Sequence, residues 1–223
     1  MEELIIRQAI LSKNKKSVVI TLSNNTIWEF PIDVALKYSL QKDRILTTQL
    51  LEEIIAEKRL YEAMMFALRK ANSSSKTKME MKKLLLKHQF TEEETNYVID
   101  ALEEKHILDD TRFADNAVQF LKNKKMYGKI KIRIYLQNKG IDPNIIDQAI
   151  EKNFTGDEDY EVAQALLEKY KLRIARKLPK YREAYFIGVM YRNGFSPSYA
   201  RKFVSDAIQN GIIEVNSDNT NYI

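Results

Sequence analysis

Three apolar stretches occupy the first thirty residues, and short polar segments separate them as turns would. The stretches run over Leu4–Leu11, Ser17–Leu22 and Thr26–Pro31 and are rich in isoleucine, valine and threonine. Such runs are typical of strands, so the pattern predicts a small three-stranded meander. Three short strands need a covering layer to be stable. We expect a short helix over residues 32–40 to supply it through Val34, Leu36 and Tyr38.

From about Thr47 onward, apolar positions recur at three- and four-residue spacing, which is the period of an amphipathic helix. Thr48 is suited to cap the start of this helical part. Proline and glycine are scarce beyond it, and nearly all stand where a helix is expected to start or stop. The predicted fold class is therefore mainly α, with a small N-terminal β-containing region.

Three segments of the helical part align without gaps, beginning at Met81, Ile132 and Phe186, with offsets of 51 and 54 residues. In each, an apolar residue precedes a capping residue: Phe90–Thr91, Ile141–Asp142 and Phe195–Ser196. Offsets of this size are typical of helical repeat arrays. Each copy is interpreted as three helices, expected over 110–125, 128–138 and 142–153 in the middle copy, with 61–71 and 160–169 opening the others. The predicted boundaries are 1–46 for the β region with its short helix, 47–107, 108–154 and 155–215 for repeats 1 to 3, and 216–223 for a polar tail.

One segment carries two conflicting patterns. Between Lys129 and Leu136 an isoleucine or leucine stands at every second position, which by itself favours a strand. The aligned segments of the other copies, Leu84–Leu86 and Val189–Met190, do not alternate in this way. Because copies of one repeat should share a fold, we expect a helix here.

Charge is segregated along the chain, although the formal net charge is only +5. Residues 121–140 contain seven lysines and arginines and no carboxylate, and residues 169–182 contain the same number. Residues 92–110 and 157–161 are acidic. Such alternation suits a protein that meets a polyanion on some surfaces and avoids it on others. Solvated helix faces would produce the same pattern, so both interpretations stay open.

Several kinds of chemistry lack their usual residues. The chain has no cysteine, which excludes disulfides and thiolate sites and fits a reducing compartment. Neither His88 nor His106 has a serine or acid at triad-like placement, and the phosphate-binding, dinucleotide and HExxH motifs are absent. The start lacks signal-peptide features, and no run of 18 apolar residues occurs. We expect a soluble, cytoplasmic, monomeric protein without cofactor, metal, membrane contact or enzymatic activity.

The segment from Leu108 to Ile141, which contains LDDTRFADNAVQF and YGKIKIRIYLQNKGI, resembles the central signature of RecX proteins. That family shows an L-D-D-x-x-F-A helix start, a G-Y-G turn, a basic helix and a K-G-(V/I) exit. The matching residues are Leu108, Asp109, Asp110, Phe113, Ala114, Tyr127, Gly128, Lys139, Gly140 and Ile141. Similar stretches such as ALKYSLQKDRILT extend the resemblance over nearly the whole chain. Two places depart from it: Met126 replaces the first glycine of the turn, and residues 72–78 replace an arginine-containing loop.

The resemblance implies tandem three-helix repeats in an elongated, curved array that regulates the RecA recombinase. It implies binding to the RecA filament on DNA and inhibition of strand exchange and of the coupled ATP hydrolysis. Single-stranded DNA is a second expected partner, bound weakly and in a salt-dependent manner. Candidate contacts are the basic residues and one tyrosine of the two basic segments: Lys122, Lys124, Lys125, Tyr127, Lys129, Lys131, Arg133, Lys139, Arg173, Arg176, Lys177 and Lys180.

Two other functions stay open. The three-helix units could act as helix-turn-helix modules of a stand-alone DNA-binding protein, although their third helices are mostly acidic or neutral. An array that binds other proteins as a scaffold is a further possibility.

The remaining signature residues have structural interpretations. Asp109 and Asp110 stand at a helix start, where their carboxylates can cap free N–H groups. Phe113 is expected in the core. Gly128 is expected to adopt a positive φ, and Tyr127 beside it either belongs to an ordinary helix stop or stacks on a ligand.

Overall fold

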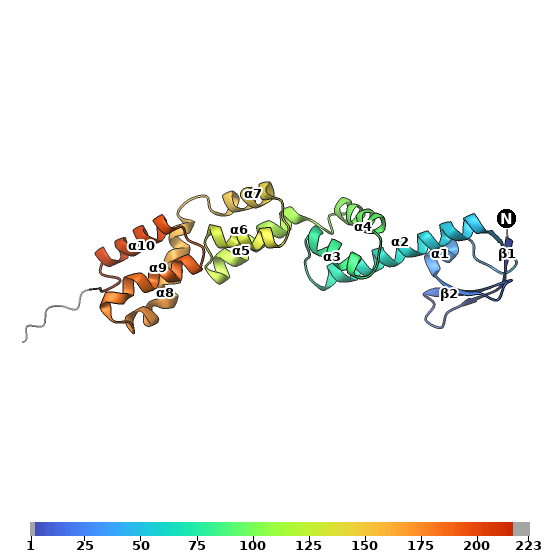
Figure 1. Ribbon diagram of the computed structural model, residues 1–223, viewed down its shortest axis with the longest axis horizontal. Helices are drawn as coiled ribbons and strands as arrows, with labels where there is room; N and C mark the ends of the chain where they lie inside the picture. The colour runs from blue at the N-terminus through green and yellow to red at the C-terminus, as the bar shows by residue number, and fades with distance from the viewer. Residues whose placement is uncertain (1–2, 216–223) are drawn as a thin grey trace, which may run out of the picture. The chain divides into compact units, whose positions relative to one another are not determined.

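The computed structural model describes residues 3–215, and the predicted polar tail at 216–223 lies outside the described residues. The chain divides into two compact units, with the division between Leu108 and Asp109. The predicted fold class is confirmed, because a small antiparallel sheet is followed by helices along the rest of the described chain (Figure 1).

The helices of the first unit are α1 (Ile32–Lys37), α2 (Thr48–Ser73), α3 (Lys78–Lys87) and α4 (Glu92–Glu104). Those of the second unit are α5 (Asp110–Lys125), α6 (Lys129–Asn138), α7 (Pro143–Asn153), α8 (Glu158–Ala175), α9 (Pro179–Arg192) and α10 (Pro197–Gln209). The bounds of α5, α6 and α7 lie within one residue of the helices predicted for the middle copy.

The first unit begins with a sheet in the order β3-β2-β1-β4. Its strands are β1 (Glu3–Leu11), β2 (Ser17–Leu22), β3 (Ile27–Pro31) and β4 (Ile45–Thr47). The first three strands form the predicted meander. The expectation of only three strands is wrong, because β4 pairs with the other edge of β1, where Leu4 lies opposite Leu46. A strand of three residues is too short to show a period-two pattern, so the sequence did not reveal it.

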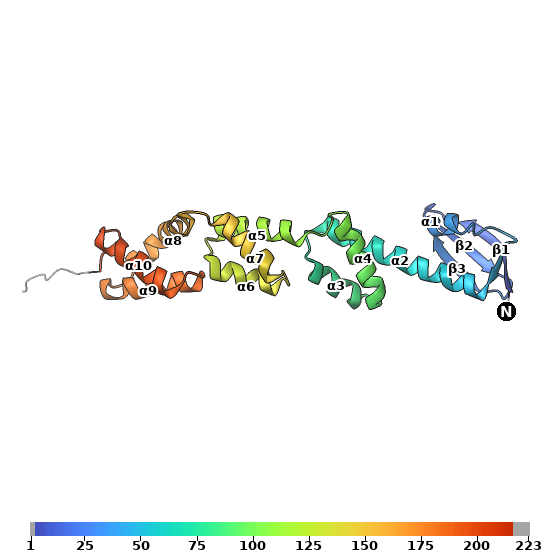
Figure 2. The same ribbon diagram turned by 90° about the horizontal axis from the view of Figure 1, so that it is seen from above.

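Helix α1 and the first turns of α2 cover one face of this sheet (Figure 2). The core between them joins Ile20 and Phe30 of the sheet to Val34 of α1 and Ile54 of α2. Leu36 is 71 % exposed, so the prediction that it belongs to the covering layer is wrong. Only the side of this six-residue helix that carries Val34 and its neighbour Ala35 faces the sheet.

Helix α2 is a single helix of 26 residues, and it begins one residue after its N-cap, Thr47, instead of being capped by Thr48. Its first turns complete the core of the sheet, and its second half packs Ala63 and Ala67 into a separate core with α3 and α4. The helix predicted to open at Tyr61 is therefore the continuation of a longer one. Arg59, between the two halves, donates two hydrogen bonds to the Glu94 carboxylate of α4, at 2.5 and 2.9 Å.

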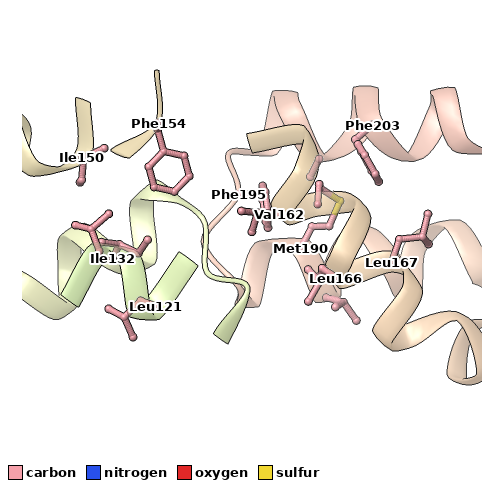
Figure 3. Packing of buried hydrophobic residues seen from close by; sticks show 14 of the residues in the cluster. Leu121, Ile132, Ile150, Phe154, Val162, Leu166, Leu167, Met190, Phe195 and Phe203 are labelled. Carbon is pink, nitrogen blue, oxygen red and sulfur yellow. The ribbon is translucent and has the colours of Figure 1, made fainter. Parts of the chain in front are cut away.

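The second unit contains repeats 2 and 3, and one hydrophobic core runs through both. Figure 3 shows Phe154 and Phe195 between the helices of the two repeats. The predicted repeat is confirmed in its capping geometry, because the side chains of Thr91, Asp142 and Ser196 each accept a hydrogen bond from a backbone N–H of the helix they precede.

The segment with conflicting patterns is helical, as the repeat predicted. Side chains two residues apart lie on nearly opposite faces of a helix. Ile132 and Leu136 are consequently buried in the core, whereas Ile130 and Ile134 are 45 % and 51 % exposed. The strand-like alternation thus produces a helix with two apolar stripes, one packed against the protein and one facing solvent.

Candidate functional site

The turn between α5 and α6 differs from the expectation for its glycine. Gly128 has φ −77°, which any residue adopts, so the predicted positive φ is wrong. The left-handed residue is Met126, with φ 57° and ψ 44°, and its N–H closes the last turn of α5 on the carbonyl oxygen of Lys122. Met126 stands where the resembling family has its first glycine. A residue with a Cβ in this conformation costs about 1 kcal/mol.

Gly128 is required by a close approach of two backbones. Its N–H donates to the carbonyl oxygen of Asn193, at 2.7 Å, in the turn between α9 and α10. A Cβ built on Gly128 would lie 2.5 Å from the carbonyl oxygen of Gly194, and a Cβ built on Gly194 would lie 2.4 Å from the Cβ and the backbone nitrogen of Lys131. The Ile130 N–H also donates to Gly194, at 3.2 Å. Repeats 2 and 3 therefore meet through two turns that only glycines allow to come so close.

Two of the candidate contact residues stabilise this junction. Lys131 donates from Nζ to the carbonyl oxygen of Arg192, at 2.8 Å, near the end of α9. A cation there interacts favourably with the negative end of the helix dipole. The same ammonium lies 3.9 Å from the ring centroid of Tyr127, which is itself partly buried. Tyr127 thus has an internal cation on its ring.

Three further cations of the central segment bind partners inside the second unit. Lys122 donates to the carbonyl oxygen of Asn153, at 2.6 Å, and lies 5.3 Å from the Phe154 ring centroid. Lys129 pairs with Asp159 at 2.6 Å and lies 5.1 Å from the same ring. Together the two lysines hold the segment that links α7 to α8. Arg133 pairs with Asp147 of α7 at 2.5 Å.

The exposed cations of the central segment are Lys124 and Lys125, in the last turn of α5. Lys125 lies 5.8 Å from the ring centroid of the exposed Phe120, and neither lysine pairs with a carboxylate among residues 3–215. Lys139 is half-buried and lies 5.7 Å from the Tyr135 ring. We call Lys124 and Lys125 the α5 basic pair.

The second basic segment forms an exposed surface at the end of repeat 3 where α8 meets α9. Its four candidate cations are all exposed and have no carboxylate partner within the described part of the chain: Arg173, Arg176, Lys177 and Lys180. We call these four the α8–α9 cations. Three of them lie 5.0–5.3 Å from tyrosine rings: Arg173 at Tyr170, Lys177 at Tyr185 and Lys180 at Tyr181.

Arg182, which sequence reasoning did not single out, builds the turn beneath the α8–α9 cations. Its guanidinium donates to the carbonyl oxygens of Ala175, Lys177 and Glu214 at 3.1, 3.0 and 2.9 Å. Ala175 is the last residue of α8, where carbonyl oxygens have no acceptor role within the helix and need an outside donor. The signal available in the sequence was only a further arginine in a basic run.

The signature residues that were expected to be structural are placed as follows. Asp109 is the N-cap of α5 and accepts from the Arg112 N–H at 2.8 Å. Asp110 is buried in the first turn, and Phe113 packs at the edge of the core. Gly140, with φ 74°, takes the positive φ that follows the end of α6.

Burial raises the pKa of Tyr199 to about 12, and the carboxylates of Asp159 and Asp157 act in the same direction. This tyrosine stacks on Phe195 and Phe203 and lines a cavity of about 520 Å³ beside the start of α8. Among residues 3–215, no three histidine, aspartate or glutamate side chains come together as metal ligands would. No helix in that range is both long and apolar enough to span a bilayer.

Comparison of the sequence with known proteins gives one family. Residues 109–150 match the family model of the RecX second three-helix domain. The regulatory protein RecX of Clostridium acetobutylicum is 31 % identical over 194 residues, which cover 81 % of this chain and 89 % of the relative. That of Leuconostoc citreum is 26 % identical over 191 residues, covering 86 % and 71 %.

Two crystal structures share the fold. One of a regulatory protein RecX has a TM-score of 0.74 at 23 % identity and covers 91 % of this chain and 99 % of its own. One of RecX from Lactobacillus salivarius has a TM-score of 0.60 at 21 % identity, covering 66 % and 96 %. The signature residues are in place, and the Clostridium acetobutylicum relative is 31 % identical over most of both chains. The chain therefore belongs to the RecX family of regulatory proteins.

Proposed function

We propose that this protein is a negative regulator of the RecA recombinase, which binds the RecA filament on DNA and lowers its ATP hydrolysis and strand exchange. Membership of the RecX family is the observation that carries the proposal. The structure supports it in one respect: the continuous core and the glycine junction make repeats 2 and 3 a single body. The α5 basic pair and the α8–α9 cations are therefore held at fixed positions, which suits a partner with regularly repeated binding sites.

The charges that are free to meet such a partner are fewer than the basic runs suggest. Three lysines of the central segment already bind acceptors within the second unit: Lys122, Lys129 and Lys131. The α5 basic pair and the α8–α9 cations have no such partners in the described part of the chain, so we assign the electrostatic contact to them. If they contact phosphates, binding should weaken with salt: the logarithm of the binding constant should fall with the logarithm of the salt concentration by about 0.7 to 0.9 per contact.

Stand-alone DNA binding through the third helices fits the structure less well. A helix that reads the major groove needs neutral or basic residues on its exposed face. In α4 that face carries Glu92, Glu93 and Asp100, and in α7 it carries Glu151 and a lysine, Lys152, that pairs with Asp115. Of the third helices α4, α7 and α10, only α10 exposes two adjacent cations, Arg201 and Lys202.

The test is the ATP hydrolysis of RecA stimulated by single-stranded DNA, measured with substoichiometric amounts of this protein. We expect the wild type to suppress turnover. The double variant Lys124→Glu/Lys125→Glu should need at least about a tenfold higher concentration for half-maximal inhibition. Lys129, Lys131 and Arg133 stay unchanged, because reversing them would also break contacts within the second unit.

A matched control is Lys83→Glu/Lys87→Glu, which reverses the same number of exposed charges on α3 of the first unit. Loss of inhibition in the control as well would show that total charge matters and the α5 basic pair does not. If the wild type leaves turnover unchanged at every concentration, the proposed function is wrong, and salt-sensitive binding to bare DNA would then favour the alternative.

A further inference from the structure

The end of repeat 3 where α8 meets α9 exposes large apolar side chains among its cations. Leu172 is 75 % exposed, Leu178 is 62 % exposed and Tyr181 is 54 % exposed. Ile212, which follows α10, is 48 % exposed and lies at the same end, since it lines one cavity with Lys171 and Arg182. Isolated exposed leucines are ordinary, but a group of large apolar side chains at one place indicates an interaction surface.

A small cavity lies at the same end of repeat 3, and Ile212 is the member of this group that lines it. Its volume is about 190 Å³, and its walls include Leu167 and Ile174 of α8 with Ile212 and Ile213. The aliphatic parts of Lys171 and Arg182 also line it, together with Ala175 and Glu214. Most of the surrounding charge is positive, because Glu214 in the lining pairs with Arg182 at 3.6 Å, whereas the α8–α9 cations lack carboxylate partners among the described residues.

The exposed leucines beside the α8–α9 cations distinguish between two kinds of polyanionic partner, a nucleic acid and an acidic protein segment. A nucleic acid would use the cations and the tyrosine rings but would leave Leu172 and Leu178 facing water or phosphate. A protein segment with acidic side chains around one apolar anchor would cover both, with the anchor in the cavity and carboxylates on the cations. Charge complementarity and the exposed leucines thus favour a protein partner.

We infer that this surface, formed by Leu172, Leu178, Tyr181 and the α8–α9 cations, is the docking site for an acidic protein segment that carries an apolar anchor residue. The inference rests on the proposed function, since the segment is sought on the RecA subunits of the filament. It adds that repeat 3 contacts protein, independently of any DNA contact made by the α5 basic pair.

The first experiment measures binding to RecA filaments on single-stranded DNA and, separately, to the same DNA without RecA. In the variant Leu172→Gln/Leu178→Gln the apolar area is lost, while helix propensity and charge are kept. We expect its apparent Kd for the filament to rise at least about tenfold and its Kd for bare DNA to stay unchanged. The control Leu36→Gln removes a leucine of similar exposure, 71 %, from α1 and should leave both constants unchanged.

The second experiment uses the absence of cysteine from the chain. A Leu178→Cys variant carries a single thiol, so a maleimide-linked photoreactive group attaches at that position alone. Crosslinking to filaments should join it to a RecA peptide rich in aspartate and glutamate, whereas a Leu36→Cys variant should give no such product.

Crosslinks to DNA, crosslinks to a RecA segment without carboxylates, or an unchanged Kd for the double glutamine variant would each overturn the inference while leaving filament binding in place. If the wild type itself does not bind the filament, the proposed function fails and this inference fails with it.

Discussion

Replacing Gly128 by serine tests the close approach between repeats 2 and 3 with a clear sign. Serine is at least as good an N-cap as glycine, and φ −77° with ψ 168° suits it. A residue with a Cβ also loses less backbone entropy on folding, which is worth about 0.4–1 kcal/mol. Considered alone, the local turn therefore predicts a more stable protein. Thr77 occupies the equivalent N-cap, 51 residues earlier, so the turn itself tolerates a side chain.

The junction predicts the opposite result. A Cβ at position 128 would lie 2.5 Å from the Gly194 oxygen and 2.8 Å from its carbonyl carbon, and both are backbone atoms. Relief to an ordinary contact of about 3.4 Å needs a shift of roughly 1 Å. A shift of that size would break the hydrogen bonds from the Gly128 and Ile130 N–H groups, now 2.7 and 3.2 Å long. Two lost bonds at about 1 kcal/mol each, with looser packing, give a net loss of about 2–3 kcal/mol.

The assay is chemical denaturation of the full chain, combined with hydrogen exchange on peptides from α6 and α10. We expect Gly128→Ser to lower the free energy of unfolding and to raise exchange on both sides of the junction. The control Gly156→Ser places its Cβ no closer than 3.6 Å to any neighbouring atom and should be nearly neutral. Equal or greater stability of Gly128→Ser, with unchanged exchange, would refute the reasoning.

Three further predictions concern single residues. Hydrogen bonds from Arg59 lower the pKa of Glu94, so the folded state is favoured while the carboxylate is ionised, and this stability is lost as the pH falls from about 4.5 through the lowered folded-state pKa. Glu94→Gln should lower stability at pH 7 by about 1 kcal/mol and flatten the loss of stability below about pH 4.5 in acid titrations followed by circular dichroism. Gln89→Gly should raise the free energy of unfolding by about 0.5–1 kcal/mol in urea titrations, because Gln89 has φ 64° at the position that Gly140 and Gly194 occupy in the other copies; no gain would mean that its left-handed backbone is unstrained. With a pKa of about 12, Tyr199 should ionise at a higher pH than an exposed tyrosine in an ultraviolet titration. If Tyr199→Phe keeps the ionisation step at the highest pH, that step does not belong to Tyr199.

Much of the helical architecture was predictable because its signals are local. The apolar–cap pairs at Ile141–Asp142 and Phe195–Ser196 fixed the repeat, and the repeat then decided the helix over 129–138 against its strand-like alternation. The same alignment contained an unused signal: glycines at 140 and 194 predict a positive φ at residue 89, although glutamine stands there.

Which cations bind internal partners and which stay exposed was not predictable, because the partners are distant in sequence. Lys131 binds a carbonyl 61 residues away and Lys122 one 31 residues away. A basic run shows how many charges a segment has, whereas the fold determines which of them are already engaged. The same reason hid the role of Gly128, since its neighbour Gly194 is 66 residues further along the chain.

The sharing of α2 between two cores couples the folding of the first unit. Ile54 lies in the core of the sheet and Ala63 in the core with α3 and α4, nine residues apart on one uninterrupted helix. Loss of order in either core would fray the helix that the other core needs, so both should melt in one cooperative transition. Four short strands would gain from this arrangement, since alone they bury too little to persist. A truncated protein that starts at residue 47 would keep every helix after α1, yet it would expose Ile54 and lose the support that the sheet gives to the start of α2.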